Sequence, residues 1–247
     1  MHRRQYLRAA GALAGASALS GCSAFGESDS DIAPGISAEG VDPATVAWRT
    51  RDRIADASYD FEWRTEGDRL GTEFFQAIYD RADEQFLLRN REGGAHVVDF
   101  YAAGEAYRNT APGDPSAEDR FEALHRSRFE LAETLRAGTE QIVRVWISGY
   151  EYDAPEEREE GIHLDIVGGQ SLVPYRFDDP EGYLLVSEDG VIQDLQVAGT
   201  PVNDTEEGEP TPLDSHMAAR LTLETDGVEV IEPDWVATAR QSLEGQG

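Results

Sequence analysis

The chain has 247 residues, of which 49 are acidic and 21 are basic, and every basic residue is arginine, so the formal net charge is -28. Phosphate binding needs a basic surface, so this composition excludes nucleic acid and electrostatic docking on anionic lipid. Like charges repel over ~10 Å in 0.1 M salt but only over ~3 Å in 1 M salt. Because a chain with this net charge repels itself less in concentrated salt, the composition favours a halophilic protein. An acidic disordered chain is the alternative, and the nine Tyr, nine Phe and four Trp argue against it.

The first 21 residues have the pattern of a cleavable export signal. Arg3 and Arg4 precede a small, apolar run from Ala9 to Leu19, and no acidic residue comes before Glu27. This run is shorter than the roughly 20 residues that cross a bilayer as a helix. The arginine pair resembles a twin-arginine signal, which exports folded proteins.

Leu19-Ser20-Gly21-Cys22 resembles the lipobox of bacterial and haloarchaeal lipoproteins, in which the cysteine carries the lipid after cleavage. Cys22 is the only cysteine of the chain, so an internal disulfide is excluded. An ordinary cysteine within a signal peptide is the alternative. We expect a protein anchored by lipid to the outer face of the cell membrane, with residues 22–40 as a flexible acidic tether and 41–247 as one domain.

The domain is predicted to begin with a helix from Pro43 to Ala57, capped by Asp42. Tyr59, Phe61 and Trp63 then alternate with charged residues, which is typical of a half-buried strand. Further strands are predicted over Thr72 to Tyr79, Gln85 to Asn90 and His96 to Tyr101. A second amphipathic helix is predicted from Ser116 to Ala137, ended by Gly138.

The remaining runs predict strands joined by hairpin turns at Asp189-Gly190 and Asp226-Gly227. They cover Glu140 to Tyr152, Ile162 to Val167, Gly182 to Ser187, Val191 to Val197 and Met217 to Thr225. The acidic stretches Glu156 to Glu160 and Asn203 to Pro212 are predicted to be solvated loops. Asn203-Asp204-Thr205 permits N-glycosylation at Asn203, with a chance triplet as the alternative.

Three segments together resemble a family of haloarchaeal lipoproteins of unknown function: Ser58 to Phe61 after the first helix, Glu188 to Ile192, and Val228 to Trp235. That family is similar in architecture to the LolA and LppX/LprG lipoprotein carriers. The resemblance implies an α+β fold, in which a strongly curved antiparallel sheet forms a half-barrel and helices cover its concave face. It also implies a cavity that holds lipid.

No catalytic or metal-binding pattern is evident in the sequence. The five histidines (His2, His96, His125, His163 and His216) are scattered, and none has the spacing of a zinc site. Nucleotide-binding loops and nucleophile elbows are also missing from the sequence, so we expect neither enzyme activity nor a cofactor or metal. The dense carboxylates are read as a solvated halophilic surface rather than as calcium ligands.

Aromatic residues on the predicted strands, together with Trp146, are candidates to line a cavity on one side of the sheet. They are Tyr59, Phe61, Trp63, Phe75, Tyr79, Phe86, Phe100, Tyr101 and Trp146. Packing beneath the helices, without a cavity, is the alternative. Trp235 is read as a ring that seals the end of the core, with ligand binding as the alternative.

Two functions from different classes follow from these residues. The first is a lipid-anchored carrier, which we expect to be a monomer, for an apolar ligand such as a lipid or isoprenoid. The second is an anchored structural or protein-interaction protein of the envelope, with a filled core and no ligand. The volume between sheet and helices distinguishes the two.

Replacement of Cys22 by serine tests the anchor. Cys22→Ser removes the thiol that would carry the lipid, so the protein should be released to the medium or remain as uncleaved precursor. Fractionation of cells followed by mass spectrometry of the N-terminal peptide measures this. Membrane retention of a correctly cleaved Cys22→Ser protein would contradict lipid attachment at this residue.

Dilution of salt tests the halophilic prediction. The screening of about 49 carboxylates falls as salt is removed, so the domain should expand or unfold at low salt. Circular dichroism and denaturant titration at 0.1 M and 2 M KCl measure this. Equal free energies of unfolding at the two salt concentrations would exclude a halophilic adaptation.

Overall fold

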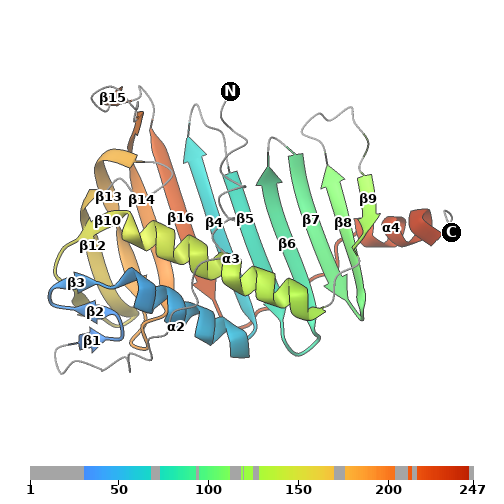
Figure 1. The fold of residues 1–247 in the computed structure, drawn as a ribbon, viewed down its shortest axis with the longest axis horizontal. Coiled ribbons are helices and arrows are strands. Elements are labelled where there is room, and N and C mark those ends of the chain that lie inside the picture. The colour runs from blue at the N-terminus through green and yellow to red at the C-terminus, as the bar shows by residue number, and fades with distance from the viewer. Residues whose placement is uncertain are drawn as a thin grey trace, which may run out of the picture.

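In a computed structural model of the protein, the residues described are 31–67, 73–92, 95–111, 118, 120–124, 128–169, 176–203, 211–212 and 216–244. Their main feature is an antiparallel sheet of thirteen strands (Figure 1). Along its main path the order is β10 (Tyr150–Tyr152), β12 (Gly161–Gly169), β13 (Arg176–Val186), β14 (Ile192–Asn203), β16 (Met217–Glu224), β4 (Tyr59–Gly67), β5 (Glu73–Asp80), β6 (Gln85–Glu92), β7 (Ala95–Ala102), β8 (Glu105–Ala111) and β9 (Arg120–Ala123). The short strands β11 (Glu156–Arg158) and β15 (Thr211–Pro212) pair with β12 and β14.

Helices α2 (Pro43–Asp56) and α3 (Arg128–Ser148) lie on one face of this sheet, and α3 crosses it diagonally (Figure 1). Asp42 caps α2, since the amide of Ala44 donates a 3.0 Å hydrogen bond to Asp42 Oδ1. The first predicted helix is therefore confirmed. The mostly antiparallel α+β architecture is also confirmed, and no helix in the described part of the chain is long and apolar enough to span a membrane.

The strand with alternating aromatic and charged residues is also confirmed. Tyr59, Phe61 and Trp63 of β4 face α2 and α3 and belong to the main hydrophobic core. Leu221 and Leu223 of β16 lie directly opposite Trp63 and Phe61 and continue this apolar face. Because successive side chains of a strand alternate between faces, the charged residues of β4 lie on the other side of the sheet.

Residues 31–41 differ from the expected flexible tether and domain boundary. They form three short antiparallel strands, β1 (Asp31–Ala33), β2 (Ile36–Ser37) and β3 (Gly40–Val41). Ala33 and Ile36 are buried and pack in the main core, beside α2. The apolar residues of this stretch, such as Ile32, Ile36 and Val41, follow neither helical nor strand spacing, so periodicity did not predict these strands. The ordered domain therefore begins before residue 41.

The second helix was predicted in the wrong place. Residues 120–123 form strand β9 instead, and α3 begins at Arg128 and continues through Gly138 to Ser148. The predicted strand from Glu140 to Tyr152 is therefore wrong over most of its length, and only β10 remains at its end. Packing explains the difference, because Thr139, Val143 and Trp146 recur at helical spacing and are all buried. A glycine inside a helix costs only about 1 kcal/mol relative to alanine, which tertiary packing exceeds.

A second hydrophobic core lies on the opposite face of the sheet, behind β5 to β9. Helix α4 (Trp235–Glu244) and the segment before it cover this face, with Val230, Val236 and Ala239 buried there. Neither α4 nor β8 and β9 was predicted. The predicted loop from Glu156 to Glu160 is exposed as expected, although Glu156–Arg158 forms β11. At the two ends of the other predicted loop, Asn203 to Pro212, β14 extends to Asn203 and Thr211–Pro212 forms β15.

Candidate functional site

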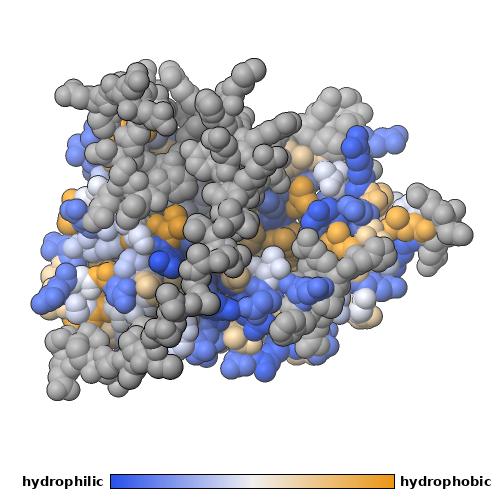
Figure 2. All heavy atoms as spheres, viewed as in Figure 1, coloured by the Kyte–Doolittle hydropathy of each residue, from blue (hydrophilic) through white to orange (hydrophobic). Residues whose placement is uncertain are grey.

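A cavity of about 90 Å³ lies between the first half of α3 and strands β6 to β8. Its lining residues are Phe86, Leu88, Asp99, Phe100, Tyr101, Arg108, Leu124, Thr134 and Leu135. Leu88, Arg108 and Leu124 are half-buried, so solvent reaches the cavity. Figure 2 shows apolar residues at the surface near β9 and α4, at the same end of the sheet as the cavity.

The wall formed by the sheet is apolar because of its register. Phe86 lies opposite Tyr101, and Tyr101 lies opposite Ala106 on β8. These side chains share one face of three neighbouring strands, the face that α3 covers. The sheet wall of the cavity therefore consists of every second residue along the antiparallel strands β6, β7 and β8.

An ion pair interrupts this apolar face. Asp99 of β7 and Arg108 of β8 are direct cross-strand partners, and the guanidinium Nε and Nη2 donate to the two carboxylate oxygens at 2.6 and 2.7 Å. The Asp99 side chain is only 9% exposed and that of Arg108 is 33% exposed. A buried charge is tolerated when it is paired and hydrogen-bonded, which the bidentate geometry provides here.

Helix α3 forms the opposite wall with Leu135 and Thr134. Leu135 is buried, whereas the hydroxyl of Thr134 lies at the exposed rim and donates to the carbonyl of Glu130 at 2.7 Å. The cavity therefore has a hydrocarbon interior and polar groups from both walls.

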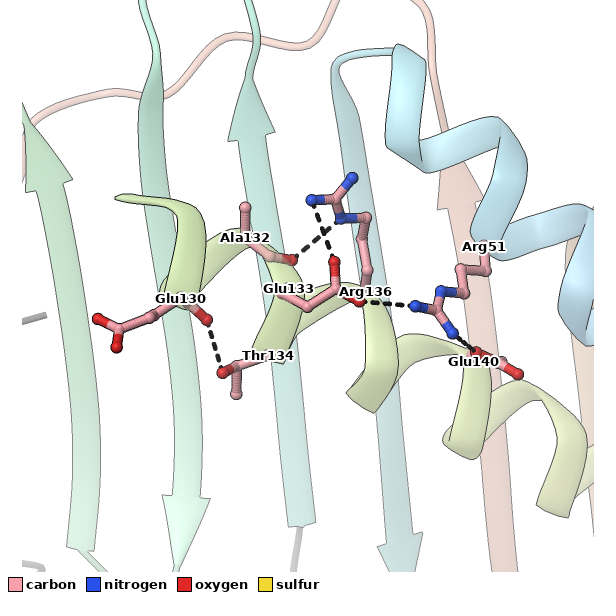
Figure 3. A network of polar contacts seen from close by, with 7 residues as sticks. All are labelled: Arg51, Glu130, Ala132, Glu133, Thr134, Arg136 and Glu140. Atoms are coloured by element: carbon pink, nitrogen blue, oxygen red, sulfur yellow. Dashed lines mark hydrogen bonds and ion pairs between the residues drawn. The ribbon is translucent and has the colours of Figure 1, made fainter. Parts of the chain in front are cut away.

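Arg51 of α2 links α3 to the rest of the fold (Figure 3). Its guanidinium donates to Glu133 at 2.6 Å and to Glu140 at 2.8 Å. Arg136 also approaches Glu133 at 3.4 Å and donates to the carbonyl of Ala132. The hydrogen bond to Glu140 is the main reason that the pKa of Arg51 is raised above its usual value, so Arg51 remains charged.

A row of aromatic rings connects the centre of the sheet with the cavity. Neighbouring centroids are 6.0 Å apart for Tyr59 and Tyr79, 4.5 Å for Tyr79 and Phe86, and 5.7 Å for Phe86 and Tyr101. Tyr59 is buried, and desolvation raises the pKa of its phenol well above the usual value, so it stays neutral. The row provides a rigid apolar support for the sheet wall.

The nine aromatic residues predicted to line a cavity are divided by the structure. Phe86 and Tyr101 line the cavity, and Phe100 borders it while its side chain packs in the second core on the other face. The remaining six pack within the main core: Tyr59, Phe61, Trp63, Phe75, Tyr79 and Trp146. Phe100 and Tyr101 are neighbours on one strand, so the two could not face the same side.

The sequence interpretation missed Leu88, Asp99, Arg108, Leu124, Thr134 and Leu135 as residues of the site. A signal was present for Asp99. It lies two residues before Tyr101 on the same strand, so both side chains face α3 and a charge is expected on the covered side. Arg108 could be matched to it only after β8 had been recognised. Thr134 and Leu135 lie within the second predicted helix, but its packing against β6 to β8 had no local signal in the sequence.

Several predicted residues fall elsewhere. Arg3, Arg4 and Cys22 lie outside the described residues, as do Asp204 and Thr205 of the sequon, while Asn203 ends β14. Trp235 starts α4 and stacks on Phe121 with centroids 6.1 Å apart, in the second core. Within the described part of the chain, no group of three or more acidic, His or Cys side chains is placed to hold a metal ion.

Comparison with known proteins gives similarity to solved structures only. No protein-family profile and no curated protein matches the sequence. Among solved structures, the chain is similar to a LolA superfamily protein from Nitrosomonas europaea, with 12% sequence identity and a TM-score of 0.23. The match covers 80% of this chain and 97% of that one.

Removal of the Arg51 guanidinium tests how firmly α3 is attached. The ion pairs are partly solvated, with 41% of the Arg51 side chain exposed, so Arg51→Gln should lower the free energy of unfolding by less than about 1 kcal/mol in 2 M KCl. Denaturant titration beside Arg53→Gln, an exposed arginine on the same helix, provides the comparison. A loss several times larger than in the control would show that the pairs, rather than apolar packing, hold α3 in place.

Proposed function

We propose that this protein is an exported, lipid-anchored binding protein that takes up the apolar part of a small molecule or lipid between α3 and strands β6 to β8. The anchor would be Cys22 and the domain would work as a monomer at the outer face of the membrane. In this proposal the sheet acts as a half-barrel whose inner face is closed by α3.

The observation that carries the proposal is the cavity itself, which combines an apolar lining with a few convergent polar groups. Such a combination is typical of ligand sites. Phe86, Leu88, Tyr101, Leu124 and Leu135 supply the apolar surface, and its opening at half-buried residues gives a ligand access.

The volume limits what the cavity can hold in this conformation. Sites for drug-sized ligands measure roughly 300–1,000 Å³, and an engineered cavity of about 150 Å³ takes up benzene. The present volume of about 90 Å³ therefore suits a group of only a few carbon atoms, such as one end of a chain whose other carbons lie in the opening. A whole acyl or isoprenoid chain would need α3 to separate from β6 to β8.

An anchored envelope protein with a filled core remains the second candidate. It is favoured by six of the nine candidate aromatic residues, which pack against one another and against the helices instead of lining a cavity. In that case the small cavity would be a packing defect and would take up no ligand.

Calorimetric titration with 1-octanol separates the two functions. The sample is the full chain carrying Cys22→Ser, in 2 M KCl, so that no detergent competes for the cavity. Leu135→Phe fills the cavity and should weaken octanol binding at least tenfold. Gln141→Phe places the same ring at an exposed position of α3 and should leave binding unchanged. Overpacking costs about 1–3 kcal/mol, so cooperative melting of both variants is checked first.

Each result has a distinct meaning. Failure of octanol to bind the unsubstituted chain would favour the envelope protein. Equal binding by a folded Leu135→Phe protein would place the ligand outside this cavity.

A further inference from the structure

The bidentate pair of Asp99 and Arg108 gives the cavity a chemical preference as well as a shape. We infer that the ligand of this cavity is an amphiphile with an uncharged head group that donates a hydrogen bond, such as a hydroxyl, and that fatty acids and other anions are rejected. This inference rests on the proposed apolar binding function and specifies the class of ligand.

The first step concerns the position of the pair. Asp99 and Arg108 line the same cavity as Leu88 and Leu135, so a chain lying on these leucines brings its polar end to the pair. A pure hydrocarbon would leave the polar lining without a new hydrogen bond, although desolvation of polar groups is costly. A hydroxyl can donate to the carboxylate of Asp99, because each carboxylate oxygen can accept more than one hydrogen bond.

The second step concerns charge. Asp99 uses both carboxylate oxygens to bind Arg108, so the positive charge of the guanidinium is neutralised within the cavity. On the neighbouring strand, Glu122 is the direct cross-strand partner of Arg108 and is exposed. Thr134, at the rim, is uncharged. A carboxylate ligand would therefore meet one cation already paired with Asp99 and a second negative charge nearby.

The third step is a comparison within the molecule. Asp194 and Arg220 form another bidentate pair, with Nε at 3.3 Å and Nη2 at 3.0 Å from the carboxylate oxygens. That pair lies on the face of the sheet that carries the charged residues of β4, because Leu195 and Leu221 beside it point into the main core. It thus reproduces the chemistry of the cavity pair without the cavity and supplies a matched control.

The experiment compares 1-octanol with octanoate by calorimetric titration at pH 8, with the full Cys22→Ser chain in 2 M KCl. The two probes have the same chain length and differ in the charge of the head group. In the unsubstituted cavity, octanol should bind at least tenfold more tightly than octanoate. This ranking needs no change in the cavity and so does not depend on the folding of a variant.

Asp99→Asn then removes the negative charge of the bidentate pair and should shift the octanol-to-octanoate preference at least tenfold towards octanoate. Asp194→Asn should leave the preference unchanged. Glu122→Gln removes an exposed charge without breaking the pair, and should shift the preference in the same direction by a smaller factor, about twofold to threefold, because salt screens exposed charges. Thermal melting confirms that each variant is folded.

The outcomes distinguish this inference from the function on which it rests. Binding of octanoate as tight as that of octanol, or an unchanged preference in folded Asp99→Asn protein, would overturn the inference while leaving an apolar binding site. Binding of neither probe would overturn both.

Discussion

The alternation of aromatic and charged residues along β4 determines which face of the sheet must be covered. Tyr59 and Phe61 are almost completely buried, and Trp63 contacts Trp146 of α3 with centroids 5.9 Å apart. An aromatic side chain buries about 150–250 Å², which corresponds to roughly 4–6 kcal/mol at ~25 cal/mol per Å². Exposure of two such residues would remove much of the ~5–15 kcal/mol by which a domain is stable. The diagonal course of α3 is a consequence of this requirement.

The opposite face of the sheet is polar in one half and apolar in the other. Near β12 to β4 it remains polar, with Tyr183 donating to Asp194 at 2.9 Å and Arg220 paired to the same carboxylate. Behind β5 to β9 it is apolar, with Leu87 and Phe100 buried under the segment that leads into α4. On this side the sheet is therefore solvated in one half and covered in the other. The solvated half gives the acidic residues of the chain a surface on which they stay in water.

Sequence patterns predicted those parts of the fold whose signals are local. The cap at Asp42 and the strict alternation from Tyr59 to Trp63 identified α2 and β4, and Asp189-Gly190 identified the hairpin of β13 and β14. The hairpin predicted at Asp226-Gly227 is wrong, because no strand follows β16 among the described residues and the chain continues into α4. The failures arose where packing outweighed a local signal, as at Gly138, which lies inside α3, and in β-branched residues such as Val143, which lie on its buried side. The strands β8 and β9 contain charged residues on the face that points inward, so alternation of apolar residues could not reveal them. The candidate site lies between α3, the predicted strands β6 and β7, and the missed strand β8, so the partner that Arg108 provides for Asp99 was not predicted.

The two walls of the cavity are supported to different degrees. Behind the sheet wall, Arg240 lies 5.6 Å above the ring of Tyr107, and Trp235 stacks on Phe121, so β8 and β9 are held from the second core. Within that wall the Asp99–Arg108 pair fastens β7 to β8 directly. The α3 wall is held by the side chain of Leu135 and by the partly exposed ion pairs to Arg51. Each of these ion pairs contributes little to the free energy of folding. Strands joined by a continuous hydrogen-bond ladder cannot separate without breaking it, whereas a helix can shift on side chains alone. Enlargement of the cavity for a longer chain therefore has to come from α3, and the polar pair remains in place at the sheet wall as it does so.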